Sequence, residues 1–76
     1  MWKEENNCLC REFIFKDFKS AFAFMAEVGI IAEELNHHPE WTNIYNKVMI
    51  KLSTHEAGNV VTDKDRRMAA LIDKLI

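Results

Sequence analysis

The chain has 76 residues, of which 49% are hydrophobic and 29% are charged, and its formal net charge is −2. This composition is typical of a globular domain and excludes a disordered or membrane-spanning chain. Lys and Arg are interspersed with Asp and Glu, so we expect no direct nucleic-acid partner and no membrane contact. The length predicts one domain, residues 1–76, with a small core that oligomerisation would help to stabilise.

The first regular element is predicted to be a strand from about Leu9 to Lys16, because side-chain character alternates with period two. One face carries Leu9, Arg11, Phe13 and Phe15, and the other carries Cys10, Glu12 and Ile14. Cys8 and Cys10 share a face, but the short link between them disfavours a mutual disulfide, so both are predicted to be free thiols. Free thiols and a start, Met1 to Glu5, that resembles no signal peptide favour a reducing cytoplasmic location.

A long helix is predicted from about Phe18 to His37, with Asp17 as its N-cap. Two apolar rows run along it, so the helix is expected to bury one face on a sheet and the other on a second element or subunit. The first row is Phe18, Phe22, Met25, Gly29, Ala32 and Asn36, and the second is Phe24, Val28, Ile31 and Leu35. Pro39 is predicted to end the helix, because a residue before proline is pushed out of the α region. His37 would be the last helical residue and His38 would be extended.

The second half of the chain is predicted to be strand and then helix. Trp41 to Ser53 alternates as a strand does, with a bulge or tight bend expected at Asn46-Lys47. The two faces are Val48, Ile50 and Leu52, against Lys47, Met49 and Lys51. After a loop, Thr62 and Asp65 have the spacing of a capping box at the start of a second helix. Because the loops are too short for parallel crossovers, the order of elements predicts an α+β fold, an antiparallel sheet with helices packed on one face.

The candidate site contains the only three histidines, His37 and His38 at the helix end and His55 in the loop after the long strand. Imidazole titrates closest to neutral pH, so it can both donate and accept a proton. Glu33 is four residues before His37 on the same helix face, where a carboxylate can fix the imidazole tautomer. The alternative is that these histidines are polar helix-end and loop residues without a catalytic role. A metal is disfavoured, because adjacent histidines are not the i, i+4 pair that a helix offers to zinc.

A pattern with fixed internal gaps runs through these residues: Glu33, His37, His38, Pro39, Tyr45, His55 and Asp65. In this pattern the chain resembles the pterin-4a-carbinolamine dehydratases, also called dimerisation cofactors of a hepatocyte homeodomain transcription factor. The resemblance covers most of the chain, because it extends through Phe13–Phe18, Trp41, Tyr45–Val48 and Leu52–His55. Two departures stand out. The helix that usually precedes the family's N-terminal tryptophan is missing here, and the loop has Gly58-Asn59-Val60-Val61 where relatives often carry Gly-Gly-Leu.

The resemblance implies a two-layer sandwich without the usual N-terminal helix and a hydro-lyase activity that needs no cofactor. The implied reaction is dehydration of 4a-hydroxytetrahydrobiopterin to quinonoid dihydrobiopterin, a step of tetrahydropterin recycling. Loss of the hydroxyl needs a proton donor and formation of the quinonoid ring needs a proton acceptor, and both are tasks for imidazoles. His37 and His55 are the implied acid–base pair, His38 is the implied pterin-orienting residue, and Glu33 is expected to orient His37.

Further substrate contacts and partners follow from the same resemblance. Trp2 is expected to line the pterin pocket, and Trp41, Tyr45 and Asp65 are further candidate contacts. Core packing is the alternative explanation for Trp41 and Tyr45, and the capping box is the alternative for Asp65. The alternative function is a protein-binding dimerisation module or transcriptional coactivator. The expected surface for that partner, or for a homodimer or homotetramer, is the row with Phe24, Val28 and Ile31. On this expectation the substitution Phe24→Asp dissolves a homo-oligomer.

Overall fold

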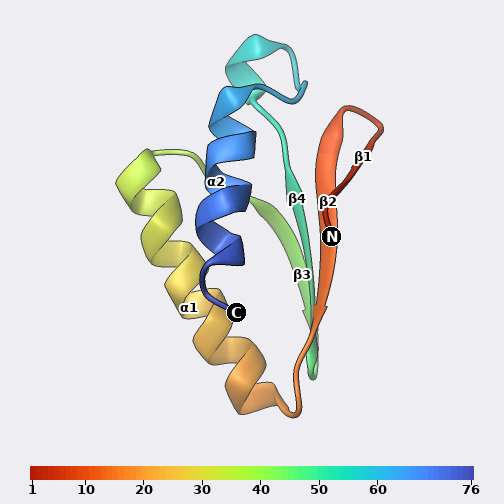
Figure 1. Ribbon diagram of the computed structural model, residues 1–76, viewed down its shortest axis with the longest axis vertical. Helices are drawn as coiled ribbons and strands as arrows, with labels where there is room; N and C mark the ends of the chain where they lie inside the picture. Colours follow the sequence, from red (N-terminus) through yellow and green to blue (C-terminus); the bar gives the residue numbers. More distant parts are fainter.

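The computed structural model describes all residues, 1–76, as a four-stranded sheet with two α-helices and one short 3₁₀ helix. The elements in chain order are β1 (Lys3–Glu5), β2 (Cys8–Ile14), α1 (Phe18–Leu35), β3 (Glu40–Ile44), β4 (Lys47–Leu52), η1 (His55–Ala57) and α2 (Asp63–Asp73). Every neighbouring pair of strands is antiparallel, and the order across the sheet is β1-β2-β4-β3. Figure 1 shows both helices on one face of the sheet, so the predicted α+β fold is confirmed.

The helix-facing side of the sheet is apolar because β2 and β4 place their buried residues opposite one another. The buried side chains of these two central strands are Leu9, Phe13, Val48, Ile50 and Leu52. Both predicted alternations are therefore confirmed. No helix covers the other face (Figure 1), which carries Glu12 and Lys51 together with the exposed Ile14. Cys8 and Cys10 lie on this face as free thiols, as predicted.

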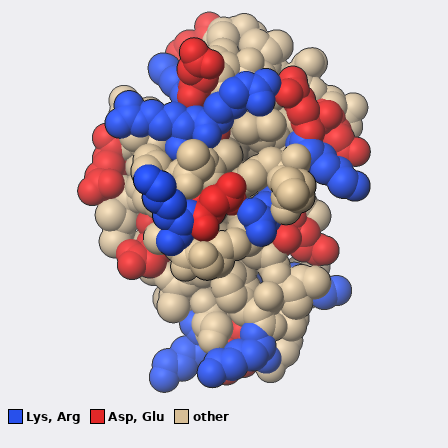
Figure 2. All heavy atoms as spheres, viewed as in Figure 1, with Lys and Arg blue, Asp and Glu red and all other residues tan.

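Charges of both signs are mixed on the face that Figure 2 shows. In Figure 2, basic and acidic side chains interleave over the face that contains both helices and the edge of the sheet. Neither α-helix has the length and hydropathy that a membrane span requires.

The sheet contains two tight turns, of which the sequence pattern predicted a bend only at the second. Asn6 and Asn7 join β1 to β2 with φ angles of 50° and 64°, the paired positive values of a type I′ turn, in which asparagine is favoured. β1 is absent from the sequence prediction because its three residues are all charged and show no alternation. The predicted strand Trp41–Ser53 is two strands, with Tyr45 (φ 49°) and Asn46 in the turn between them. The expected bend is real and makes a hairpin.

The helix α1 begins where the sequence predicts and ends two residues earlier. Asp17 is its N-cap and accepts a first-turn backbone N–H at 2.8 Å. At the other end Asn36 is left-handed (φ 50°, ψ 45°), and the His37 N–H donates to the Ala32 carbonyl at 3.0 Å, as in a Schellman motif. The prediction that the helix reaches His37 and is ended by Pro39 is therefore wrong. The left-handed turn at Asn36 has already taken the chain off the helix axis.

The face of α1 that packs on the sheet carries Phe24 and Val28. Phe24 is only 6% exposed, and its ring centroid lies 4.7 Å from that of Phe13 on β2. Phe22 and Phe18 belong to the other apolar row of α1 and are 60% and 47% exposed. The expectation that the row with Phe24 is a partner surface, which Phe24→Asp would disrupt, is wrong, because this row is the hydrophobic core.

Candidate active site

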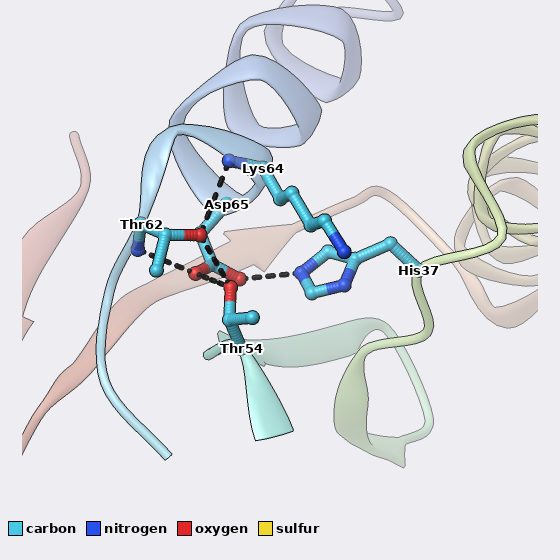
Figure 3. A network of polar contacts seen from close by, with 5 residues as sticks. All are labelled: His37, Thr54, Thr62, Lys64 and Asp65. Atoms are coloured by element: carbon cyan, nitrogen blue, oxygen red, sulfur yellow. Dashed lines mark hydrogen bonds and ion pairs between the residues drawn. The ribbon is translucent and has the colours of Figure 1, made fainter. Parts of the chain in front are cut away.

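The site forms where the end of α1, the end of β4 and the start of α2 meet (Figure 3). Its centre is Asp65, in the first turn of α2, which is fully buried with 0% exposure. The carboxylate accepts hydrogen bonds from the Thr62 N–H at 2.9 Å, the Thr54 hydroxyl at 2.7 Å and His37 Nε2–H at 2.6 Å. The predicted capping box of Thr62 and Asp65 is confirmed. The same carboxylate also holds a histidine from the far end of α1.

Asp65 is ionised at neutral pH. Burial by itself raises the pKa of the carboxyl, because a charge loses its hydration. The hydrogen bonds from His37, from the Thr62 backbone and from Thr54 outweigh this effect and hold the pKa below its ordinary value of 3.8. A carboxylate can only accept, so the proton between the two side chains is on Nε2 of His37. In the neutral imidazole, Nδ1 is then the unprotonated nitrogen.

The second histidine, His38, pairs with Glu33. Nε2 of His38 lies 2.6 Å from Oε2 of Glu33, and the two side chains are 57% and 79% exposed. The prediction that Glu33 orients His37 is wrong, because the chain leaves the helix at Asn36 and His37 no longer shares a helix face with Glu33. At this exposure the pair contributes at most about 1 kcal/mol to stability. Its effect is to hold the ring orientation of His38.

The third histidine, His55, is placed by a closed loop. The Thr54 N–H donates to the Val60 carbonyl at 2.8 Å, and the Asn59 N–H donates to the Thr54 carbonyl at 3.0 Å. Gly58 has φ 89°, a left-handed conformation that glycine adopts without strain. Nδ1 of His55 lies 2.9 Å from Oδ1 of Asn59, which can only accept. Nε2 of His55 is therefore the nitrogen that remains free.

The three imidazoles share one arrangement, in which one ring nitrogen is held by an oxygen acceptor and the other is available. The exposed Glu56 links two of them electrostatically. Its pKa is lowered first by its own backbone N–H and then by the positive charge of Lys64, with smaller contributions from His37 and His55. Figure 3 shows the Lys64 side chain running toward the His37 ring. Glu56 therefore lies within electrostatic reach of both His37 and His55.

The aromatic residues predicted as substrate contacts lie outside this cluster. The indole N–H of Trp2 donates to Asp73 at 2.8 Å, at the opposite end of α2, and its ring packs edge-on against Phe13 at 5.9 Å. Tyr45 is 62% exposed in the β3–β4 turn, at the opposite end of β3 from the histidine pair. Trp41, at the start of β3, is partly buried against the core. Of the four predicted contacts, only Asp65 touches a histidine in this chain.

One residue at the centre of the cluster was not singled out by the sequence. Thr54 is 4% exposed and bonds both Asp65 and Thr62, but no spacing rule marks a threonine at the end of a strand as a buried donor. Its position directly before His55 is the one available signal. No group of three or more His, Cys, Asp or Glu side chains is arranged to hold a metal ion.

The family model described as pterin 4 alpha carbinolamine dehydratase matches residues 1–75. A provisionally named pterin-4-alpha-carbinolamine dehydratase of Prochlorococcus marinus (strain NATL2A) is 47% identical over 75 residues, which cover 99% of this chain and 78% of the relative. A relative with the same provisional name, from Paraburkholderia xenovorans (strain LB400), is 58% identical over 65 residues, 86% of this chain and 67% of that protein.

Two solved structures share the fold. The crystal structure of a transcriptional coactivator/pterin dehydratase from Brucella melitensis has a TM-score of 0.91 at 44% identity, covering 96% of this chain and 79% of that one. A pterin dehydratase-like protein, identified as a RuBisCO assembly factor in the alpha-carboxysome, has a TM-score of 0.78 at 24% identity, covering 99% of this chain and 86% of that one. With the match over nearly its whole length, the chain belongs to the pterin-4-alpha-carbinolamine dehydratase family.

Proposed function

We propose that this protein is a hydro-lyase that dehydrates 4a-hydroxytetrahydrobiopterin to quinonoid dihydrobiopterin in tetrahydropterin recycling. The observation that carries the proposal is the state of the three histidines in the family signature. Each has one ring nitrogen held by an oxygen, from Asp65, Glu33 or Asn59, and the other nitrogen free. If the three histidines were only polar helix-end and loop residues, none of them would need an oxygen partner that fixes one ring nitrogen.

The reaction needs two proton transfers, which the site can divide between two imidazoles. The C4a–O bond breaks as the hydroxyl takes up a proton and leaves as water, and loss of the N5 proton forms the C4a=N5 double bond. His37 is the candidate base at Nδ1, because ionised Asp65 at its other nitrogen stabilises the imidazolium that forms. His55 is the candidate acid at Nε2 in its doubly protonated form, because Nδ1–H is donated to Asn59 and only Nε2–H can reach the substrate. His38, held by Glu33, is the candidate pterin-orienting residue.

We also propose that the protein is a cytoplasmic homodimer or homotetramer. An apolar row on the outer face of α1 supports this assembly, because its side chains are too exposed for an isolated chain of this size. The row consists of Phe18, Phe22 and Ile30, which are 47%, 60% and 55% exposed. The rings of Phe18 and Phe22 stack on one another with centroids 5.9 Å apart. A role for Trp2, Trp41 and Tyr45 in binding the pterin stays a prediction.

The activity is tested by the rate at which purified protein removes the absorbance of 4a-hydroxytetrahydrobiopterin. His37→Ala and His55→Ala are each expected to lower kcat by about 10²- to 10⁴-fold, the usual contribution of a general acid or base. His38→Ala is expected to act mainly on KM. Thr42→Ala, an exposed change on the uncovered sheet face, is the control. A wild-type rate equal to the spontaneous rate would overturn the function, and normal rates for both histidine variants would overturn the site.

The alternative function, a dimerisation module or transcriptional coactivator, is supported by the same outer face of α1. Phe22→Asp is expected to convert the oligomer to monomer in light scattering, whereas Ala23→Asp, at an exposed position beside it, leaves the mass unchanged. If Phe22→Asp abolishes binding to another protein while the dehydration rate per chain is kept, the face serves a partner in addition to self-association.

A further inference from the structure

We propose that Thr54 and Thr62 are positioning residues of this site, whose hydroxyl groups form a one-way relay that holds Asp65 as the acceptor for His37. The relay occupies Oδ2 of Asp65 and so leaves Oδ1 to accept from Nε2–H of His37. This inference deepens the proposed dehydratase function and rests on it.

The direction of the relay follows from counting protons. The backbone N–H of Lys64 donates to Thr62 Oγ1 at 3.3 Å, and the Oγ1 atoms of Thr62 and Thr54 lie 2.5 Å apart. Thr54 Oγ1 donates to Asp65 Oδ2 at 2.7 Å. A hydroxyl has one proton, so Thr54 cannot also donate to Thr62, and the bond between the threonines is donated by Thr62. Every proton in the chain of contacts therefore points toward Asp65 (Figure 3).

The relay also fixes the orientation of the Asp65 carboxylate. Oδ2 of Asp65 receives both the Thr54 hydroxyl and the Thr62 N–H, at 2.7 Å and 2.9 Å. Oδ1 is left for His37 Nε2–H at 2.6 Å. Thr54 is 4% exposed and Asp65 is 0% exposed, so water does not replace a lost hydroxyl without local opening. Thr54 thus acts on His37 through Asp65, from a position that faces away from solvent.

Loss of the Thr54 hydroxyl has a definite electrostatic consequence. With one donor fewer, the carboxylate carries more of its charge toward His37 and favours the imidazolium over the neutral ring. Less of the enzyme then has Nδ1 available as a base at neutral pH. The other charged groups near His37 are Lys64 on α2 and Glu56 on η1. His38 follows directly in the chain and is paired with Glu33. None of these changes in a threonine variant.

The test compares Thr54→Val, which keeps the shape and removes the hydroxyl, with Thr54→Ser, which keeps the hydroxyl. Thr42→Val on the uncovered sheet face is the control for the loss of a threonine hydroxyl. For Thr54→Val, kcat at neutral pH is expected to fall about tenfold or more while KM stays within about twofold, because only the protonation state of the base is altered. The acid limb of the kcat/KM profile is expected to move to higher pH, and Thr54→Ser is expected to restore both.

A second readout does not depend on activity. Nitrogen-15 NMR of the imidazoles is expected to show a proton on Nε2 of His37 in the wild type, and a change in the Nδ1 resonance of the same ring in Thr54→Val. If Thr54→Val does not fold, Thr62→Val replaces it, because it removes the donor to Thr54 and is expected to shift both readouts in the same direction. An unchanged His37 spectrum and pH profile in a folded variant overturns the relay alone. Absence of dehydratase activity in the wild type overturns the function and leaves the NMR test of the relay intact.

Discussion

The substitution Asp65→Asn tests the centre of the site most directly. It keeps the size of a side chain that is 0% exposed and removes its charge. An amide has one acceptor oxygen and one donor NH₂. If the oxygen stays with Thr54 and the Thr62 N–H, the NH₂ faces Nε2 of His37, which must then give up its proton. The imidazole changes to the Nδ1–H tautomer, and the nitrogen proposed to act as the base is no longer free.

The size of the effect follows from the contacts that change. Hydrogen bonds to a charged partner contribute about 1.5–3 kcal/mol each, against about 1 kcal/mol for a neutral pair. The variant converts three charged bonds, to His37, Thr54 and the Thr62 N–H, to neutral ones. We expect a loss of about 3 kcal/mol, from a total of about 4–11 kcal/mol for a domain of this length. In comparable Asp–His dyads the wrong tautomer lowers kcat by about 10⁴-fold.

The assay combines urea unfolding, followed by circular dichroism, with the dehydration rate measured well below the unfolding midpoint. Asp63→Asn is the matched control, because Asp63 lies in the same first turn of α2 and is exposed. Its loss removes only a favourable charge at a helix start, about 0.3–1 kcal/mol. Equal stabilities and equal rates for the two variants would refute the assignment of Asp65 as the residue that holds His37.

The remaining predictions use paired substitutions or pH. Phe24→Ala is expected to lower the free energy of unfolding by about 3–5 kcal/mol, because Phe24 is 6% exposed. Phe22→Ala, at a position that is 60% exposed, is expected to change the stability of the monomer by less than about 0.5 kcal/mol. Urea melts of the two variants measure both effects. Gly58→Ala is expected to cost about 1–2 kcal/mol because φ is +89° there, although no atom lies within 4 Å of the added Cβ. Gly29→Ala, inside α1 with equal space, is expected to raise the melting temperature, since alanine exceeds glycine by about 0.5–1 kcal/mol in a helix. The folded-state pKa of Asp65 is lowered, so its stabilisation is complete above its ordinary value of 3.8 and is lost as pH falls through the folded-state pKa. Urea melts between about pH 4 and pH 2 should therefore lose more stability in the wild type than in Asp65→Asn.

The sequence by itself determined the features that depend on local pattern. Alternation in β2 and β4 predicted their buried faces, because a strand with one covered side must alternate. Asp17, and Thr62 with Asp65, predicted two helix starts, because the first-turn N–H groups need an acceptor close in the chain. The signature histidines also predicted the family, since fixed gaps between several polar residues are rarely met by chance.

The tertiary structure alone decided which partners those residues have. The two apolar rows of α1 are similar in composition. Only packing against Phe13 of β2 and Phe15 after it places Phe24 in the core and leaves Phe22 outside. Helical spacing pairs Glu33 with His37, but the left-handed Asn36 turns His37 to α2 and leaves Glu33 to His38. The contact between His37 and Asp65 could not be predicted from local spacing, because 28 residues separate them in the sequence. They are brought together only when α1 and α2 pack on the same face of the sheet. A cap can be predicted from neighbours in the chain, whereas a histidine and the carboxylate that fixes its tautomer meet only through folding.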